Sequence, residues 1–349
     1  MAMTEQQLLV QAVLSGDERE TARMLDSGTQ PDLQDETGWT VLMTAISSGC
    51  PLATIRILIQ HGADVSFHDK EGRSPVSLSV SSRTYSRPLL RYLLKCGADT
   101  KGALGRLSHA EAIPVLAASG ADFNESDENG ESPLTAAIRR GSDETILRAF
   151  LENGADPKKK DGKGMDAESA VACYGSSGTS FGLFLRGEDV PVYDGYTPLM
   201  LASLHNPDTA ILSWLVDHHA DVNTKTRDGQ TALMLAAMAN PNVEVMRFLL
   251  GHGSDVNARN NHGTTALMMA AIDPFHTEKL SLLVSAGAAV NAQDNSGMTA
   301  LMHAVQAYIR QDNITLLLSL GADTDIKDKR GRTAKDLATS PQARSLLTK

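Results

Sequence analysis

The chain has 349 residues and a formal net charge of −10; 42% of its residues are hydrophobic but only 4% are aromatic. An excess of acidic side chains argues against a duplex nucleic-acid partner, because phosphate contacts require clustered Lys and Arg. Sparse aromatics predict a core built from Leu, Ala, Val and Ile between small, regular elements.

The three cysteines, Cys50, Cys96 and Cys173, are odd in number and far apart, which fits reduced thiols rather than a disulfide framework. Residues 1–17 lack the basic start and long apolar run of a secretory leader. No segment approaches the ~18 consecutive apolar residues that a membrane span needs. These features predict a cytoplasmic protein with no membrane partner.

Along the chain, residues 1–34 predict an N-terminal cap with a half unit at 8–28, and two signatures recur after it. The motif Asp-x-x-Gly-x-Thr/Ser opens units at 35–40, 69–74, 127–132, 294–299 and 328–333. A pair of bulky apolar residues followed by a turn glycine closes them. The opening glycines at 195, 229, 263, 297 and 331 recur at one constant interval, which indicates a repeat array of about ten units.

Each unit predicts a turn, two short helices and a return turn. The Asp and Gly suit a hairpin, and Thr299 or Ser132 can cap the first helix. Pro133 and Pro198 suit the first helical turn, and Gly321 fits the residue that follows the second helix. The pattern favours an all-α repeat solenoid of stacked helix-turn-helix units with hairpin-like turns.

The regular spacing fails in two places. Gly97 and Gly120 are closer together than one full repeat, which predicts a truncated unit near 100–124, and the unit near 161–189 is degenerate. We therefore expect a single solenoid over 1–349. It would comprise the cap at 1–34, an N-terminal arm at 35–126, a middle at 127–189, a regular C-terminal arm at 190–327 and a C-terminal cap at 328–349, with a change of curvature but no domain boundary.

Segments 195–202, 229–237 and 253–257 (GYTPLMLA, GQTALMLAA and GSDVN) resemble the ankyrin repeat. The resemblance covers nearly the whole chain and implies a protein that binds other proteins on a concave face made of hairpin tips and first helices. Family members often carry a His where this chain has Met200, Met234, Met268 and Met302. We interpret this methionine column as packing between units.

The sequence offers little chemistry. It lacks nucleophile-elbow and zinc-protease motifs, and we expect a non-enzyme with no catalytic residues, cofactor or metal. Two alternatives remain: an enzyme or small-ligand site in the degenerate region at 158–180, or hydroxylation by an asparaginyl hydroxylase at the Val-Asn turns of Asn223, Asn257 and Asn291. The latter motif is equally explained as turn chemistry.

The positions that an ankyrin scaffold leaves free to vary are our candidate binding surface. Trp39 and Tyr196 lie at hairpin tips and have no evident core role in the repeat pattern. Large exposed side chains, above all Trp, Tyr and Arg, favour interface hot spots. We expect a monomeric adaptor or inhibitor whose protein partner contacts Trp39, Tyr193, Tyr196, Leu204, His205, Met238, Phe275, Tyr308 and Arg310.

Overall fold

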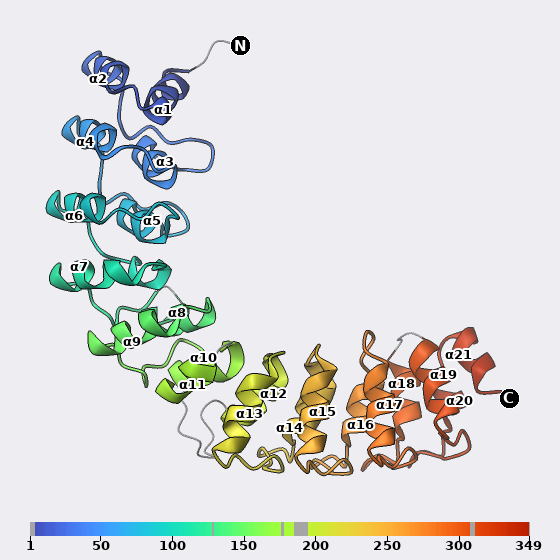
Figure 1. The fold of residues 1–349 in the computed structure, drawn as a ribbon. Coiled ribbons are helices and arrows are strands. Elements are labelled where there is room, and N and C mark those ends of the chain that lie inside the picture. Colours follow the sequence, from blue (N-terminus) through green and yellow to red (C-terminus); the bar gives the residue numbers. More distant parts are fainter. Residues whose placement is uncertain (1–3, 128, 176–177, 185–194, 308–310, 349) are drawn as a thin grey trace. The chain divides into compact units, whose positions relative to one another are not determined.

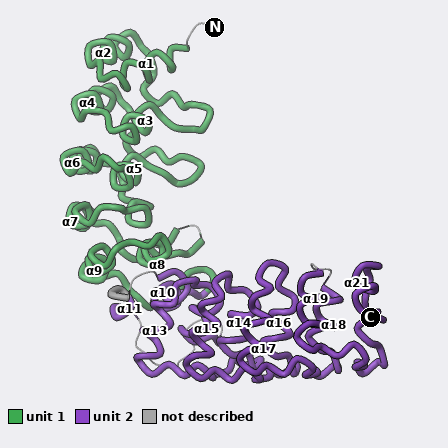
Figure 2. The backbone as a smooth tube through the Cα atoms, turned by 45° about the vertical axis from the view of Figure 1, so that its right-hand side comes forward, with its two compact units in different colours: residues 1–163 green, residues 164–349 purple. Residues whose placement is uncertain are grey.

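The structure is a computed structural model that describes residues 4–127, 129–175, 178–184, 195–307 and 311–348, with 178–180 described by backbone only. Within these ranges it is helical and has no strand, and Gln34 and Thr40 form an isolated bridge. None of the described helices is long and apolar enough to cross a membrane. The chain divides into two compact units, residues 1–163 and 164–349 (Figure 2). The expectation of a single solenoid stays a prediction.

In the first unit, pairs of short antiparallel helices stack one above the next (Figure 1). Around residues 104–112 two short 3-10 helices take the place of the first helix of a pair. The elements are α1 (Glu5–Ser15), α2 (Glu18–Asp26), α3 (Val41–Ser47), α4 (Leu52–Gln60), α5 (Pro75–Ser81), α6 (Arg87–Lys95), η1 (Leu104–Arg106), η2 (Ala110–Ala112), α7 (Ile113–Ala118), α8 (Pro133–Arg139) and α9 (Glu144–Glu152).

The second unit repeats the same helix pair with greater regularity. Its first helices are α10, α12, α14, α16, α18 and α20, and each packs on the next: α10 on α12, α12 on α14, and so on. The elements are α10 (Ala167–Tyr174), α11 (Gly178–Phe184), α12 (Pro198–His205), α13 (Thr209–Asp217), α14 (Ala232–Ala239), α15 (Val243–Gly251), α16 (Ala266–Ala271), α17 (Glu278–Ser285), α18 (Ala300–Gln306), α19 (Gln311–Ser319), α20 (Ala334–Leu337) and α21 (Pro341–Leu346).

The first helix of each of these units begins after the capping Ser or Thr that the sequence predicts. The hydroxyls of Ser132 and Thr299 each accept the backbone N–H three residues later, which satisfies one of the unpaired donors at a helix start. The same cap recurs in most other units, at Thr40, Ser74, Thr197, Thr231, Thr265 and Thr333. The capping prediction is confirmed.

The core runs along the stacked first helices. The methionine column at Met200, Met234, Met268 and Met302 is at most 2% exposed, which confirms its interpretation as packing between units. Thioethers are flexible enough to fill the irregular gaps between stacked helices. These methionines fill the space between adjacent first helices, whereas the C-terminal ends of those helices lie outside this packing.

Hydrogen bonds also link successive hairpins of the second unit. The carbonyl oxygens of Asp228, His262 and Ser296, each just before a hairpin glycine, accept the backbone N–H of the next hairpin at 2.9–3.0 Å. These bonds recur once per repeat and hold the hairpin tips in a row. The row fixes where the first helices begin and therefore where their exposed ends lie.

Candidate functional surface

Apolar side chains emerge at equivalent positions late in the first helices of the second unit. Leu204, Met238 and Ile272 occupy the same position of three successive repeats, on α12, on α14 and at the end of α16. Leu204 is half-buried, whereas Met238 and Ile272 are 40% and 41% exposed. Since these helices pack on one another, equivalent positions lie side by side. The three form what we call the apolar row.

Phe275 extends this surface in the loop after α16. Its side chain is 77% exposed, the most exposed of the large hydrophobic residues in the described ranges. The Asp273 carboxylate accepts its backbone N–H at 2.8 Å, which fixes the loop without covering the ring. A bare aromatic ring on an ordered loop is the kind of group that interface hot spots use.

A buried ion pair anchors the loop that carries Phe275. Lys279 Nζ donates to Asp273 Oδ2 at 2.6 Å and to the Ala237 carbonyl at 3.2 Å, and the side chains are 1% and 7% exposed. Burial raises the pKa of Asp273, but hydrogen bonds from Lys279, from the Phe275 N–H and from His276 outweigh it and leave that pKa below its usual value. The buried ion pair between Asp273 and Lys279 thus fixes the loop that carries Phe275.

His205 is an exposed neighbour of the apolar row at the end of α12. Desolvation by the surrounding protein lowers its pKa below the usual 6.5, so the ring is mostly uncharged at neutral pH. The position therefore adds a neutral, partly apolar ring to the surface.

The structure gives both hairpin-tip aromatics a packing role that the repeat pattern did not indicate. Trp39 is half-buried, donates through Nε1 to Asp69 Oδ2 at 3.0 Å and has the Arg73 guanidinium 4.9 Å from its ring centroid. Tyr196 is half-buried against the cluster of Ala172, Cys173 and Leu201. The expectation that Tyr196 has no core role is wrong, because its ring packs against a buried cluster that includes residues of the preceding unit. Trp39 instead makes polar contacts with the next unit, to Asp69 and Arg73. Their contact with a partner stays a prediction.

Three of the candidate residues lie outside the described ranges. These are Tyr193, Tyr308 and Arg310. The described candidates fall into three groups. Leu204, His205, Met238 and Phe275 belong to the exposed surface of the second unit, Tyr196 packs against a buried cluster of the same unit, and Trp39 lies in the first unit.

The degenerate region at 158–180 contains a buried cysteine, Cys173, whose thiol has low reactivity. Cys173 is 2% exposed, and burial raises its pKa to about 12. A thiol with that pKa is protonated at neutral pH and is a poor nucleophile. Residues 158–160 are three consecutive lysines, and Lys159 donates through Nζ to the Asn124 carbonyl. The glycine- and serine-rich turn at 175–180 falls largely outside the described side chains.

The asparagines of the Val-Asn turns bridge one unit to the next. Asn257 Nδ2 donates to the Gly287 carbonyl at 3.0 Å, and its Oδ1 accepts the Ala289 N–H at 2.8 Å. Asn223 and Asn291 make the same pair of bonds in their own units. The interpretation as turn chemistry therefore has a direct geometric basis.

Comparison with known proteins identifies the repeat. The family described as ankyrin repeats (three copies) matches residues 9–102, 169–260 and 238–328. The human SH3 and multiple ankyrin repeat domains protein 2 is 31% identical over 194 residues, which cover 52% of this chain and 10% of that protein.

Two further relatives match shorter stretches. The ankyrin repeat, SAM and basic leucine zipper domain-containing protein 1 of Dasypus novemcinctus is 36% identical over 124 residues (32% of this chain, 26% of that protein). An L-asparaginase of Dirofilaria immitis is 27% identical over 165 residues (44% of this chain, 27% of that protein). The chain spans between a tenth and about a quarter of the length of these three relatives.

Proposed function

The chain belongs to the ankyrin-repeat family, and from that premise we propose that it is a non-catalytic module that binds another protein through the apolar row and Phe275. Ankyrin repeats generally mediate protein–protein interaction. The observation that carries the proposal is the exposure of Met238, Ile272 and Phe275 on a scaffold whose other large apolar groups are mostly buried. Exposed apolar groups gathered on one side mark an interaction surface.

The energetic case rests on Phe275. Burying a Phe side chain fully is worth roughly 1.5–3 kcal/mol, and about three-quarters of this one is available to a partner. The Asp273–Lys279 pair already orders its loop. Less conformational entropy is therefore lost on association than for a free loop.

The partner that fits is a protein with an apolar ridge. A side chain or helix face that covers Met238 and Ile272 would also meet Phe275 beyond the end of α16, and a neutral His205 allows an apolar contact at the other end. We propose that the chain acts as a monomeric adaptor or inhibitor in the cytoplasm, with no nucleic-acid or membrane partner.

The experiment compares two matched variants of the full chain. The first is Met238→Ser with Ile272→Ser and Phe275→Ser; the control is Leu8→Ser with Leu14→Ser, two leucines of α1 that are 43% and 48% exposed. Tagged proteins are used for capture from the native cell, and captured proteins are quantified by mass spectrometry. Candidates are then produced pure and their affinities for both variants are measured.

We expect a partner whose affinity falls at least tenfold, or about 1.4 kcal/mol, with the triple variant and stays unchanged with the control. Circular dichroism should show equal helix content in all three proteins. If every partner binds the triple variant as tightly as the wild type, the proposed surface is wrong. A partner lost only with the α1 control would move the interface to the first unit.

A further inference from the structure

The truncated repeat of the first unit lacks a hairpin that regular repeats possess. The turn glycines Gly97 and Gly120 are closer together than one full repeat. Between Gly97 and α7 the chain forms the short 3-10 helices η1 and η2 and no hairpin. The hairpin at 69–73 therefore has no hairpin after it, and that at 127–131 has none before it.

A side chain takes over the bond that the missing hairpin would make. In regular repeats the carbonyl just before the hairpin glycine accepts the backbone N–H of the next hairpin, as at Asp228 and His262. The equivalent carbonyl here is that of Glu71, before Gly72, and it accepts Arg106 Nη2 at 2.6 Å. Arg106 satisfies the acceptor but does not fill the volume of a hairpin.

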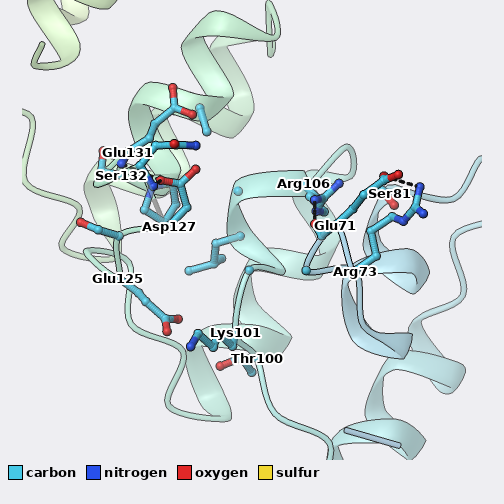
Figure 3. A pocket seen from close by; sticks show the side chains of 18 of the residues that line it. Glu71, Arg73, Ser81, Thr100, Lys101, Arg106, Glu125, Asp127, Glu131 and Ser132 are labelled. Carbon is cyan, nitrogen blue, oxygen red and sulfur yellow. Dashed lines mark hydrogen bonds and ion pairs between the residues drawn. The ribbon is translucent and has the colours of Figure 1, made fainter. Parts of the chain in front are cut away.

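The volume left open is a groove of about 960 Å³ that both charged and apolar groups line. Figure 3 shows Glu71, Arg73 and Arg106 on one side of it and Asp127, Glu131 and Ser132 on the other. Both sides come from hairpins and first helices of the first unit, so the groove lies within that unit. It is separate from the apolar row.

Several of the carboxylates that line the groove already form ion pairs or hydrogen bonds within the protein. Arg73 forms ion pairs with Asp69 and Glu71, and Arg139 pairs with Glu131. The Asp127 carboxylate accepts two backbone N–H groups of its own hairpin. These bonds stabilise the walls.

Two arginines on the inner wall lack such a partner. Arg106 and Arg140 donate to the backbone carbonyls of Glu71 and Leu107, and neither forms an ion pair with a described residue. Desolvation lowers the pKa of Arg140; Glu131 opposes that shift, and the charges of Arg106 and Arg139 add to it. The charges of Arg106 and Arg139 thus act against that of Arg140, and an incoming anion would relieve this repulsion.

We propose that this groove binds an extended or hairpin segment of a partner protein that occupies the place of the missing hairpin and sets a carboxylate on Arg106 and Arg140. The shape follows from the absent hairpin, because its neighbours present the surfaces that pack against one in the regular repeats. The charge follows from the two arginines. Two of the regular hairpins of this chain carry an aspartate at their start, Asp294 and Asp328, so a turn that begins with an acidic residue has the shape and the charge that the groove requires.

The probe is a fluorescein-labelled peptide that copies residues 291–299, a regular hairpin of this chain, and its matched form carries Asp294→Asn. Fluorescence anisotropy measures binding to the full-length protein. The protein variants are Arg106→Gln and Arg140→Gln, and the control is Arg19→Gln, an exposed arginine of α2 that does not line the groove. Circular dichroism checks that each variant is folded.

Because hydrogen bonds to charged groups are worth more than neutral ones, we expect losses of about tenfold for the Asp294→Asn peptide and for each groove variant. Arg19→Gln should bind as the wild type does, and added salt should weaken binding. The proposal is overturned if no saturable binding occurs up to about 1 mM peptide. Equal binding of the two peptides, or Arg140→Gln folded with unchanged affinity, overturns it as well. The triple serine variant of the apolar row should leave peptide binding intact, which separates this inference from the proposed function.

Discussion

Replacing Lys279 by Met removes the positive half of a buried ion pair. The Asp273 carboxylate would remain 7% exposed and would retain only the backbone N–H groups of Phe275 and His276 and the His276 ring. Breaking a buried pair from one side costs roughly 3–5 kcal/mol. The remaining hydrogen bonds place the expected loss for Lys279→Met near the lower end, at about 3 kcal/mol.

The double variant Lys279→Met with Asp273→Asn distinguishes charge from packing. With both charges gone, no ion is left unpaired in the interior, and the expected loss falls to about 1 kcal/mol. Urea unfolding followed by far-UV circular dichroism measures the free energy of unfolding, and Lys329→Met, at an exposed lysine, is the control, with an expected change within about 0.5 kcal/mol.

Two results would refute this reasoning. One is a loss below about 1 kcal/mol for Lys279→Met, which would show that Asp273 tolerates the interior without its cation. The other is a double variant as unstable as the sum of the two single changes, which would show that the charges are not coupled.

Further predictions concern backbone strain, pH and local opening. His219 has φ 72°, a left-handed conformation that glycine adopts without strain, so His219→Gly should raise the free energy of unfolding by roughly 0.5–1 kcal/mol in the same urea assay. Burial raises the pKa of Asp69, but hydrogen bonds from backbone N–H groups and from Arg73 outweigh it and hold this pKa below its usual 3.8. The Asp69 carboxylate therefore stabilises the fold above pH 3.8, and this contribution is lost as the pH falls through the folded pKa. In Asp69→Asn, the free energy of unfolding measured by urea titration should depend less on pH in this acidic range. Hydrogen exchange should be fastest within 100–180 and slower in the regular arm after 190, because stability in a repeat array depends on neighbouring units; uniform protection would contradict this.

The sequence by itself determined the repeat and its local chemistry. The constant repeat spacing, the capping hydroxyls and the turn glycines follow from bonds within a few residues, so they could be read without coordinates. The methionine column was also readable, because one scaffold position repeated in every unit has one packing environment. The exposed ends of α14 and α16 followed from the same register.

Tertiary structure decided what each variable position contacts. Lys279 is equivalent to Ile211 and Val245 in the buried stripe of the second helices, a visible anomaly in the sequence, but only the fold shows Asp273 beneath it. Whether Trp39 faces a partner or a neighbouring aspartate depends on how adjacent units pack. The short interval between Gly97 and Gly120 predicted a shortened unit, yet the groove required three-dimensional structure, because a deletion can be closed by collapse or left open. Arg106 and the ion pairs of the walls line the groove. The bond from Arg106 to the Glu71 carbonyl joins residues 35 positions apart, beyond the range of local sequence patterns.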